Sequence, residues 1–224
     1  MEQAEAIDYF NMRHPLRRLA SIVSLKARKK MFSNFIATVA PSPSDRIVDI
    51  GVTPDRSLPE SNFFENLYPF KDRLTATSIE DASFLEEMYP GLAFVRTSGS
   101  TLPFADGAFN VVVCFAVLEH VGDREAQRTF VRELLRVGRK LYLTTPNRGF
   151  PLELHTFLPL LHWLPQRSHQ SVLRAIGLHF WSKTENLNLL GEDDLRDLFP
   201  HDAPVRIIKH KLFGMTSNLI AVYA

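Results

Sequence analysis

Cysteine is almost absent from this chain of 224 residues, because Cys114 is its only one. A single thiol excludes an internal disulfide and a zinc site built on cysteine pairs. The histidines and acidic residues show no metal-ligand spacing along the chain either, so the sequence predicts no metal site. A chain without disulfides fits a reducing compartment, and we predict a cytoplasmic protein.

Long apolar runs and a strong net charge are also missing. No stretch is long enough to cross a bilayer, and residues 1–5 are acidic and polar, which argues against a signal peptide. The 26 basic and 25 acidic side chains leave a formal net charge of +1, so no overall field attracts nucleic acid. Hydrophobic residues make up 45% of the chain, which is ordinary for a globular protein, and we predict one domain.

Short apolar strands alternate with amphipathic helices between residues 46 and 144. Strand 111–115 is apolar on both faces, as a central parallel strand should be. Two strands near the C-terminus are joined through Gly214, and this short link forces them to pair antiparallel. The pattern predicts an α/β fold with a mostly parallel sheet, helices on both faces and an antiparallel C-terminal hairpin. The predicted strands are 47–50, 73–77, 92–95, 111–115, 141–144, 205–212 and 218–223, and the predicted helices are 15–39, 62–67, 81–89, 123–136, 168–176 and 192–199.

Three residues are placed to begin or end these helices. Asp81 and Asp123 each precede a helical pattern, where a carboxylate can accept hydrogen bonds from the first free N–H groups. Gly138 lies just past the end of the second of these helices, where a left-handed residue is common.

The first helix carries a basic side. One interpretation, which we favour, is a solvated helix face. The alternative is a patch for anionic lipid head groups or phosphorylated substrates, which would bring the protein to the inner face of a membrane. The basic residues are Arg13, Arg17, Arg18, Lys26, Arg28, Lys29 and Lys30.

The character of the chain changes after residue 146. Residues 146–165 are rich in proline, leucine and histidine, too apolar for a free loop and too broken for a long helix. They follow the carboxyl end of a strand, where α/β folds place their ligands, and we interpret them as a lid or substrate wall. The alternative is a packed helical excursion that only covers the core. The domain then has four parts: a helical segment (1–40), a core (45–145), the insertion (146–190) and a C-terminal helix with a strand hairpin (191–224).

The turn after strand 47–50 is the first candidate ligand loop. Gly51 ends a buried strand abruptly, and a glycine there lets backbone approach a ligand closely. The sequence alone leaves open whether Gly51 serves a ligand or only ends the strand.

Residues 102–121 (LPFADGAFNVVVCFAVLEHV) form the most specific stretch of the chain. They closely resemble the "LPF-x-DG-x-FD-x-V" and "LEH" segment of class I S-adenosylmethionine-dependent methyltransferases, and the resemblance covers residues 45–147. It implies a Rossmann-like seven-stranded sheet, with S-adenosylmethionine lying across the ends of the first, second and fourth strands.

The cofactor motifs of that family are altered in this chain. Asp49 and Gly51 are kept, but Thr53 replaces a further glycine, Ser78 stands at the ribose acid, and Ser98 stands at the adenine-binding Asp. Glu80 could replace the ribose acid, or Arg56 could grip the cofactor carboxylate. The cofactor-binding residues implied by the resemblance are Asp49, Gly51, Val52, Thr53, Ser78, Ile79, Glu80, Ser98, Gly99, Ser100 and Phe115.

Histidines supply the candidate catalytic groups. His120 follows the fourth strand at the cofactor face, and His155 and His162 lie in the insertion. Each could take a proton from a hydroxyl at neutral pH, and each could equally be a packing residue. Asn147 and Arg148 could bind substrate oxygens or a phosphate. We name His120 and His155 as the catalytic candidates.

Our first hypothesis is a methyltransferase that acts on oxygen or carbon of a small-molecule or lipid-linked acceptor, such as a quinone precursor. The second is a non-catalytic binding or scaffold protein of the same fold with an eroded cofactor site. A nicotinamide-dependent oxidoreductase is disfavoured because no G-x-G-x-x-G follows the first strand. Near-neutral charge argues against a nucleic-acid partner. The sequence leaves the oligomeric state open.

Overall fold

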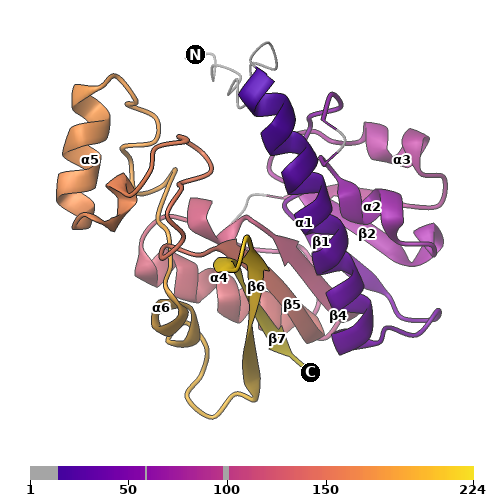
Figure 1. Cartoon of the computed structure of the whole chain (residues 1–224). Helices are drawn as coiled ribbons and strands as arrows, with labels where there is room; N and C mark the ends of the chain where they lie inside the picture. The colour runs from indigo at the N-terminus through magenta and orange to yellow at the C-terminus, as the bar shows by residue number, and fades with distance from the viewer. Residues whose placement is uncertain (1–14, 59, 98–100) are drawn as a thin grey trace, which may run out of the picture.

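The computed structural model describes residues 15–58, 60–97 and 101–224, with side chains from residue 21 onward. Seven strands form one sheet in the order β3-β2-β1-β4-β5-β7-β6 (Figure 1). The five strands from β3 to β5 are parallel, and β7 runs antiparallel to both β5 and β6. The predicted fold class is therefore confirmed. The strands are β1 (Ile47–Ile50), β2 (Leu74–Ser78), β3 (Ala93–Arg96), β4 (Phe109–Phe115), β5 (Gly138–Pro146), β6 (Val205–Leu212) and β7 (Met215–Tyr223).

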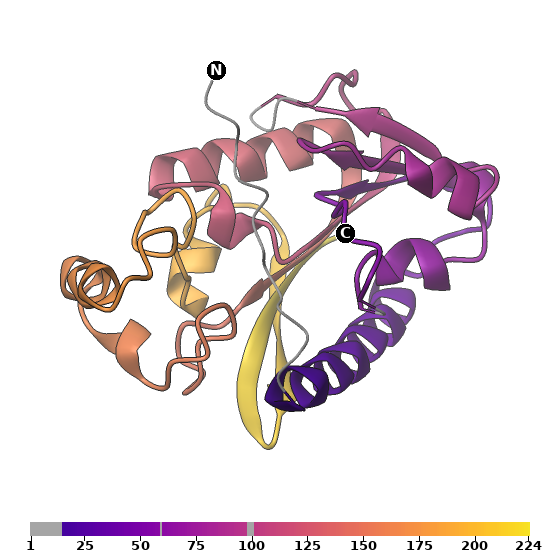
Figure 2. The same cartoon turned by 90° about the horizontal axis from the view of Figure 1, so that it is seen from above.

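Helices cover both faces of the sheet, as Figure 2 shows from above. On one face Phe35, Phe64 and Leu85, from three different helices, share a buried apolar cluster. On the other face Phe130 and Leu195 belong to a second cluster. The first face carries α1 (Pro15–Val39), α2 (Phe63–Leu67) and α3 (Phe84–Met88), and the second carries α4 (Arg124–Val137) and α6 (Glu192–Arg196).

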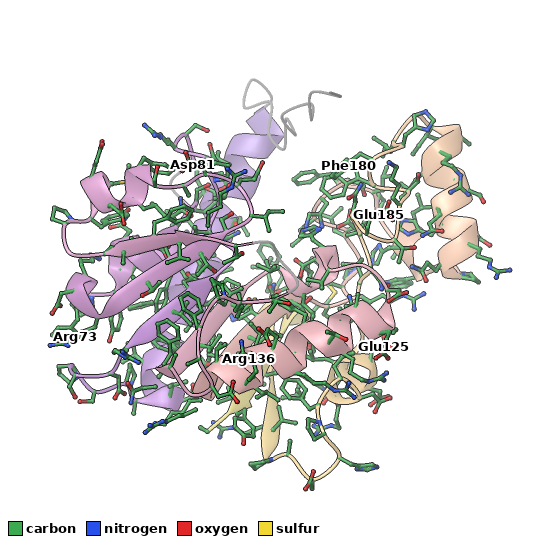
Figure 3. All side chains as sticks on the ribbon, turned by 180° about the vertical axis from the view of Figure 1, so that it is seen from behind. Arg73, Asp81, Glu125, Arg136, Phe180 and Glu185 are labelled. Atoms are coloured by element: carbon green, nitrogen blue, oxygen red, sulfur yellow. The ribbon has the colours of Figure 1, made fainter. Side chains whose placement is uncertain are left out.

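The segment that carried the family resemblance is fastened to α4. Arg136, near the end of that helix, donates to the carbonyl oxygens of Leu102 and Phe104 and pairs with Asp106 at 2.7 Å (Figure 3). Glu133 accepts the backbone N–H of Leu102 at 2.7 Å. The loop that leads into β4 is thereby held against the helix that follows the same strand.

Helix capping follows the prediction at one position and departs from it at another. Asp123 Oδ1 accepts from the backbone N–H groups of Glu125 and Ala126, so the predicted cap of α4 is confirmed. Asp81 does not cap α3, which begins only at Phe84. The Asp81 carboxylate instead accepts from Ser83 N at 2.9 Å and closes a turn before the helix.

Gly138 does not end α4 in a left-handed conformation, contrary to the prediction. Its φ and ψ of −123° and 149° are extended, and it is the first residue of β5. A Cβ at this position would lie 2.3 Å from Cγ2 of Val112. Glycine is therefore required here because β5 packs closely on β4, and not because of a turn.

Three elements in the insertion and the C-terminal part begin or end at other residues than predicted. Helix α5 (Gln166–Ala175) begins earlier than expected, α6 ends at Arg196, and β7 begins at Met215. The strands of the hairpin meet at Phe213 and Gly214, whose φ values of 51° and 80° are typical of a tight two-residue turn. Two 3-10 turns, η2 (Leu118–His120) and η3 (Leu161–Trp163), lie near the cavity described below, and a third, η1 (Lys71–Arg73), precedes β2.

None of the helices that the structure describes is both long and apolar enough to cross a bilayer.

Candidate active site

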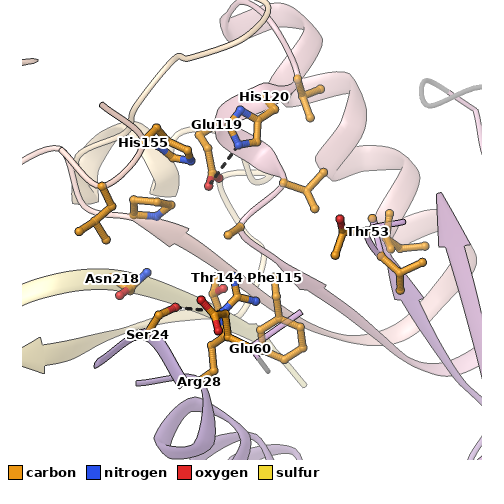
Figure 4. Close-up of a pocket in the computed structure, with 18 of the residues that line it drawn as sticks. Ser24, Arg28, Thr53, Glu60, Phe115, Glu119, His120, Thr144, His155 and Asn218 are labelled. Carbon is orange, nitrogen blue, oxygen red and sulfur yellow. Dashed lines mark hydrogen bonds and ion pairs between the residues drawn. The ribbon is translucent and has the colours of Figure 1, made fainter. Parts of the chain in front are cut away.

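A cavity of about 1850 Å³ opens at the carboxyl ends of the parallel strands (Figure 4). The residues that follow β1, β2 and β4 all line it, together with one side of α1 and part of the insertion. Because parallel strands end at the same edge of a sheet, loops that are distant in the sequence meet there. The geometry therefore brings most of the residues selected from the sequence to one place.

The loop after β1 begins at a glycine whose backbone conformation other residues rarely adopt. Gly51 has a φ of +92°, and its N–H and that of Val52 both donate to Thr77 O on β2, at 2.8 and 3.0 Å. A Cβ on Gly51 would lie 2.3 Å from Cγ2 of Val117. Gly51 therefore does more than end a strand, because the close approach of the loop after β4 leaves no room for a side chain.

A polar network replaces the missing glycines of this loop. Thr53 exchanges two hydrogen bonds with the side-chain amide of Asn62, at 3.0 and 2.9 Å. The Asp55 carboxylate accepts from Ser57, Leu58 and Ser61. Burial opposes ionisation of Asp55, but these hydrogen bonds outweigh it and lower its pKa. The loop is thus ordered by side chains where the family uses glycines.

Asp49 does not line the cavity. Its buried side chain points toward the face covered by α1 and α2 and lies within hydrogen-bonding range of Glu65. Burial, followed by the proximity of the Glu65 carboxyl group, raises the pKa of Asp49, and burial raises the pKa of Glu65. Neither Glu65 oxygen has a hydrogen-bond donor among the residues that the structure describes. Two ionised carboxylates cannot donate to each other, so a proton shared between the two acids explains the arrangement.

The end of β2 presents a serine where the family has an acid. Ser78 Oγ accepts the backbone N–H of Glu80 at 3.2 Å, and Ser78, Ile79 and Glu80 all line the cavity. The Glu80 side chain is exposed at its edge. The guanidinium carbon of Arg56 lies 4.1 Å from the centre of the Phe84 ring, and Arg56 does not line the cavity. Arg56 is therefore not placed to bind a cofactor carboxylate in this structure. The candidates Ser98, Gly99 and Ser100 lie outside the described residues.

Phe115 closes the floor of the cavity at the end of β4. Its ring makes an edge contact with Phe63, with ring centroids 4.8 Å apart. Because both rings belong to the cluster beneath the cavity, they form a rigid apolar surface under the loop after β1.

Arg28 on α1 brings a cation into the cavity, whereas the sequence predicted it on the solvated basic side of that helix. Its guanidinium lies 5.2 Å from the Phe63 ring centre and donates weakly to Ser24 at 3.4 Å. Burial lowers its pKa, against the fields of Glu60, Glu119 and Asp49. No acid lies within 4 Å of Arg28 in the described part of the chain. The signal was available, because Arg28 falls on the same helical stripe as the buried Met31 and Phe35.

Glu119 and His120 stand together just after β4. Glu119 is fully buried; its Oε2 accepts from Thr145 Oγ at 3.1 Å, and its Oε1 has no hydrogen-bond partner among the residues described. His120 Nε2 lies 3.9 Å from that Oε1, and His120 Nδ1 bonds to Asn186 O at 2.7 Å. Burial lowers the pKa of His120, which favours the neutral imidazole.

His155 reaches the same point from the insertion. Its ring centre is 4.9 Å from that of His120, and its Nδ1 bonds to Glu153 Oε1 at 2.6 Å. Burial acts against ionisation of both members of this pair, but their mutual attraction and the Thr156 hydrogen bonds prevail. The pKa of Glu153 is lowered to about 2, and the pKa of His155 is raised. Glu153 was not among the residues selected from the sequence, although its spacing of two residues from His155 suits a turn.

Three other residues considered from the sequence have structural roles. His162 Nε2 donates to Phe150 O at 2.8 Å, and His162 does not line the cavity. Arg148 donates to the carbonyl oxygens of His162 and Leu164, and the Asn147 side chain bonds to Thr216 O and Gly149 N. These contacts hold the insertion against β5 and β7, and they occupy the groups that we had considered for a substrate phosphate.

Apolar side chains form the wall next to His155. They come from the insertion and from the turn of the C-terminal hairpin, two segments that are far apart in the sequence. Phe213 at the tip of the hairpin is 80% exposed, so this side of the cavity is open to solvent. The wall residues are Phe150, Leu152, Leu154, Phe157, Leu212, Phe213 and Met215.

Comparison with known families is consistent with this architecture. Residues 66–141 match a family model described as a methyltransferase domain. The ubiquinone biosynthesis O-methyltransferase of Coxiella burnetii is 30% identical over 87 residues, which is 37% of this chain and 37% of that relative. The chain therefore matches little more than a third of the length of this curated relative.

Solved structures share the fold across most of the chain. A methyltransferase from Methanosarcina mazei has a TM-score of 0.52 at 19% identity and covers 84% of this chain and 94% of its own. Magnesium protoporphyrin IX methyltransferase from Synechocystis, solved with bound S-adenosylhomocysteine, has a TM-score of 0.57 at 13% identity, with 94% and 88% covered. At this level of identity the likeness establishes the fold.

Proposed function

We propose that the chain is a class I S-adenosylmethionine-dependent methyltransferase, and that it transfers a methyl group from S-adenosylmethionine to a hydroxyl oxygen of a small-molecule or lipid-linked acceptor. The observation that carries this proposal is a single cavity in which the loop after β1 and the Glu119–His120–His155 cluster face the same space.

The cofactor half of the cavity is the side formed by the ends of β1, β2 and β4. We assign Gly51, Val52 and Thr53 to the methionine part, and Phe115 to the floor beneath it. Glu80, exposed at the edge beside Ser78 and Ile79, is the acid available for the ribose hydroxyls, which prefer a charged acceptor. Ser98, Gly99 and Ser100 remain our candidates for the adenine, and Asp49 supports the loop from below.

Arg28 is the group we assign to the cofactor's carboxylate. S-adenosylmethionine ends in an α-carboxylate, and a guanidinium binds a carboxylate through paired, charge-assisted hydrogen bonds. Arg28 lies in the cavity without an ion-pair partner in the described residues, beside the floor residue Phe63. The free charge and its position at the β1 end of the cavity support this role.

The acceptor half is the apolar wall between the insertion and the hairpin. An acceptor whose apolar part packs on this wall would place its hydroxyl beside His155 and His120. This orientation matches the distribution of apolar and polar side chains in the cavity. The named activity of the relative, an O-methyltransferase in ubiquinone biosynthesis, supports an aromatic hydroxyl as the acceptor group. The insertion at 146–190 would then serve as the substrate wall.

The chemistry needs alignment and removal of one proton. The acceptor oxygen forms a bond to the methyl carbon as the bond from sulfur to carbon breaks, and the electron pair stays on sulfur to leave S-adenosylhomocysteine. The hydroxyl proton leaves at the Glu119–His120–His155 cluster, so we propose His120 and His155 as catalytic residues. The apolar wall and the aromatic floor also reduce the access of water to the reactive sulfonium.

The test begins with calorimetric titration of the purified chain with S-adenosylmethionine and S-adenosylhomocysteine. We expect micromolar binding of both. Methyl transfer is then measured by mass spectrometry with catechols and phenols, with and without a prenyl chain, and with methoxy analogues as controls that lack the reacting hydroxyl. A folded protein that binds neither cofactor form would contradict the proposal and favour the non-catalytic alternative.

A further inference from the structure

The Glu119–His120–His155 cluster combines three groups that bind metals well, from two segments of the chain. One potential ligand atom from each residue lies within 4.8 Å of the other two. Figure 4 shows the three side chains gathered on one side of the cavity. Two imidazoles and one carboxylate form a donor set used by divalent transition ions.

The buried carboxylate is the first sign that something belongs between these groups. Glu119 is fully buried, yet Oε1 has no hydrogen-bond partner among the described residues. A buried carboxylate oxygen without a partner costs free energy. Oε2 is held by Thr145, so the orientation of the side chain is set and Oε1 is the atom left for a ligand.

Both histidines are oriented as metal ligands usually are. His120 Nδ1 must carry a hydrogen, because its partner, the Asn186 carbonyl, can only accept. His155 Nδ1 lies 2.6 Å from the Glu153 carboxylate and donates to it. In each ring Nε2 is therefore the nitrogen left for a ligand, and a second contact that holds Nδ1 is the common arrangement around metal-bound imidazole.

The spacing is slightly wider than an occupied site would have. Ligands about 2.1 Å from one ion stand roughly 3.0–3.5 Å from each other. His120 Nε2 and Glu119 Oε1 are 3.9 Å apart, and all three ligand atoms lie within 4.8 Å of one another, so the side chains must close by between a few tenths of an ångström and roughly 1 Å to hold an ion. We propose that this cluster binds one divalent transition ion, such as Zn²⁺ or Mn²⁺, with its open positions facing the acceptor half of the cavity.

The role of the ion rests on the proposed methyl transfer. With an ion bound, the Nε2 atoms of His120 and His155 would act as ligands and no longer as bases. The acceptor hydroxyl would bind the ion as a further ligand, lose its proton more readily to solvent, and present its oxygen to the methyl carbon. The overall reaction is the same with the ion as without it: the hydroxyl and the sulfonium give the methyl ether, S-adenosylhomocysteine and one proton. The ion therefore fixes the acceptor at a set distance and direction from the sulfonium. The expectation of no metal site came from spacing along the chain, and only the fold brings His155 to Glu119.

The experiment measures metal binding apart from catalysis. The whole chain is treated with a chelator, dialysed, and titrated with Zn²⁺ and with Co²⁺, whose visible absorption reports its ligands. We expect one ion per chain, with binding weakened at least about 10–100-fold in Glu119→Gln and in His155→Gln. The exposed His179, outside the cluster, supplies the control His179→Gln, which should bind like the unaltered chain.

Two kinds of result separate the site from the function. If the unaltered chain binds no ion, or if Glu119→Gln and His155→Gln bind as well as His179→Gln, the metal site is wrong. Full methyl transfer by the chelated protein would also overturn the role of the ion, while leaving the proposed transferase intact. One ion bound at the cluster of a protein that transfers no methyl group to any acceptor would contradict the function and leave the site.

Discussion

Individual residues decide whether the cofactor half of the cavity can form. Gly51 combines a positive φ with a neighbour, Val117, that leaves no space for a Cβ. Arg28 is a charged side chain inside a cavity whose floor is aromatic. Both residues were visible in the sequence, but only their surroundings define what each does.

Gly51→Ala should weaken S-adenosylmethionine binding at least about 10-fold, since the new methyl group displaces either the loop or Val117 and backbone strain adds about 1–3 kcal/mol. Calorimetric titration measures the change. Gly107→Ala is the matched control, because Gly107 also has a positive φ (62°) but has no atom within 4 Å of a built Cβ. If both variants bind the cofactor equally well, the close approach of Val117 is not important for the site.

Arg28→Gln should weaken S-adenosylmethionine binding by about 10–100-fold, the effect of losing a charge-assisted hydrogen bond of about 1.5–3 kcal/mol. Binding of 5′-methylthioadenosine, which lacks the carboxylate, should not change. Lys29→Gln removes a charge from the exposed side of the same helix and serves as control. An equal loss for both ligands would mean that Arg28 shapes the cavity and does not bind the carboxylate.

At the scale of elements, α4 is the helix whose start bears most directly on the site. It begins at the cavity wall, one turn after the Glu119–His120 pair, and Asp123 caps it with two backbone hydrogen bonds. Gln127 in its first turns also donates to Leu118 O and Asn188 O, which joins this helix to the end of the insertion. The start of α4 thus helps to position Glu119 and His120, the half of the cluster that follows β4.

Asp123→Ala should destabilise the protein by about 1 kcal/mol, because two N–H groups of the first turn lose their acceptor. Asp123→Asn, which keeps a capping oxygen, should lose only a few tenths of that amount. Urea unfolding followed by circular dichroism measures both variants. Equal stability of the alanine variant and the unaltered chain would show that water replaces the cap without cost.

At the scale of the whole molecule, the buried acid pair Asp49 and Glu65 links stability to pH. Burial raises the pKa of both groups, so the folded state holds a proton that the unfolded chain releases. The favourable contribution is complete at low pH and is lost as pH rises above the ordinary carboxyl range. This pair lies between β1 and α2, under the cofactor loop, where unfolding would also dismantle the site.

The free energy of unfolding should therefore fall between about pH 5 and pH 8 by more in the unaltered chain than in Glu65→Gln, with a difference of at least about 1 kcal/mol. The amide cannot ionise, which removes the repulsion between the two acids. Urea titrations across this range give both profiles. The exposed Glu87→Gln is the control, and a profile as flat as that of Glu65→Gln would argue against the buried pair as the cause.

Four features could be predicted from the sequence, because each follows from a local pattern or a short link. They are the alternation of strands and helices, the burial of both faces of β4, the Asp123 cap and the C-terminal hairpin. The segment at 102–121 likewise carried the resemblance to class I methyltransferases. Gly138 could not be interpreted correctly, since its requirement comes from Val112 on the neighbouring strand. Arg56, Asn147 and Arg148 were assigned roles by residue type, but nearby rings and carbonyl groups occupy them.

The sequence by itself determined the fold class, the resemblance to methyltransferases and the loops that surround the cavity. Tertiary structure alone decided which side chains meet there, because it brings Arg28 from α1 and His155 from the insertion into the cavity that holds the Glu119–His120 pair. The physical reason is range. Secondary structure and caps depend on neighbours a few residues apart, whereas a site depends on the packing of segments whose separation along the chain has no fixed relation to their distance in space.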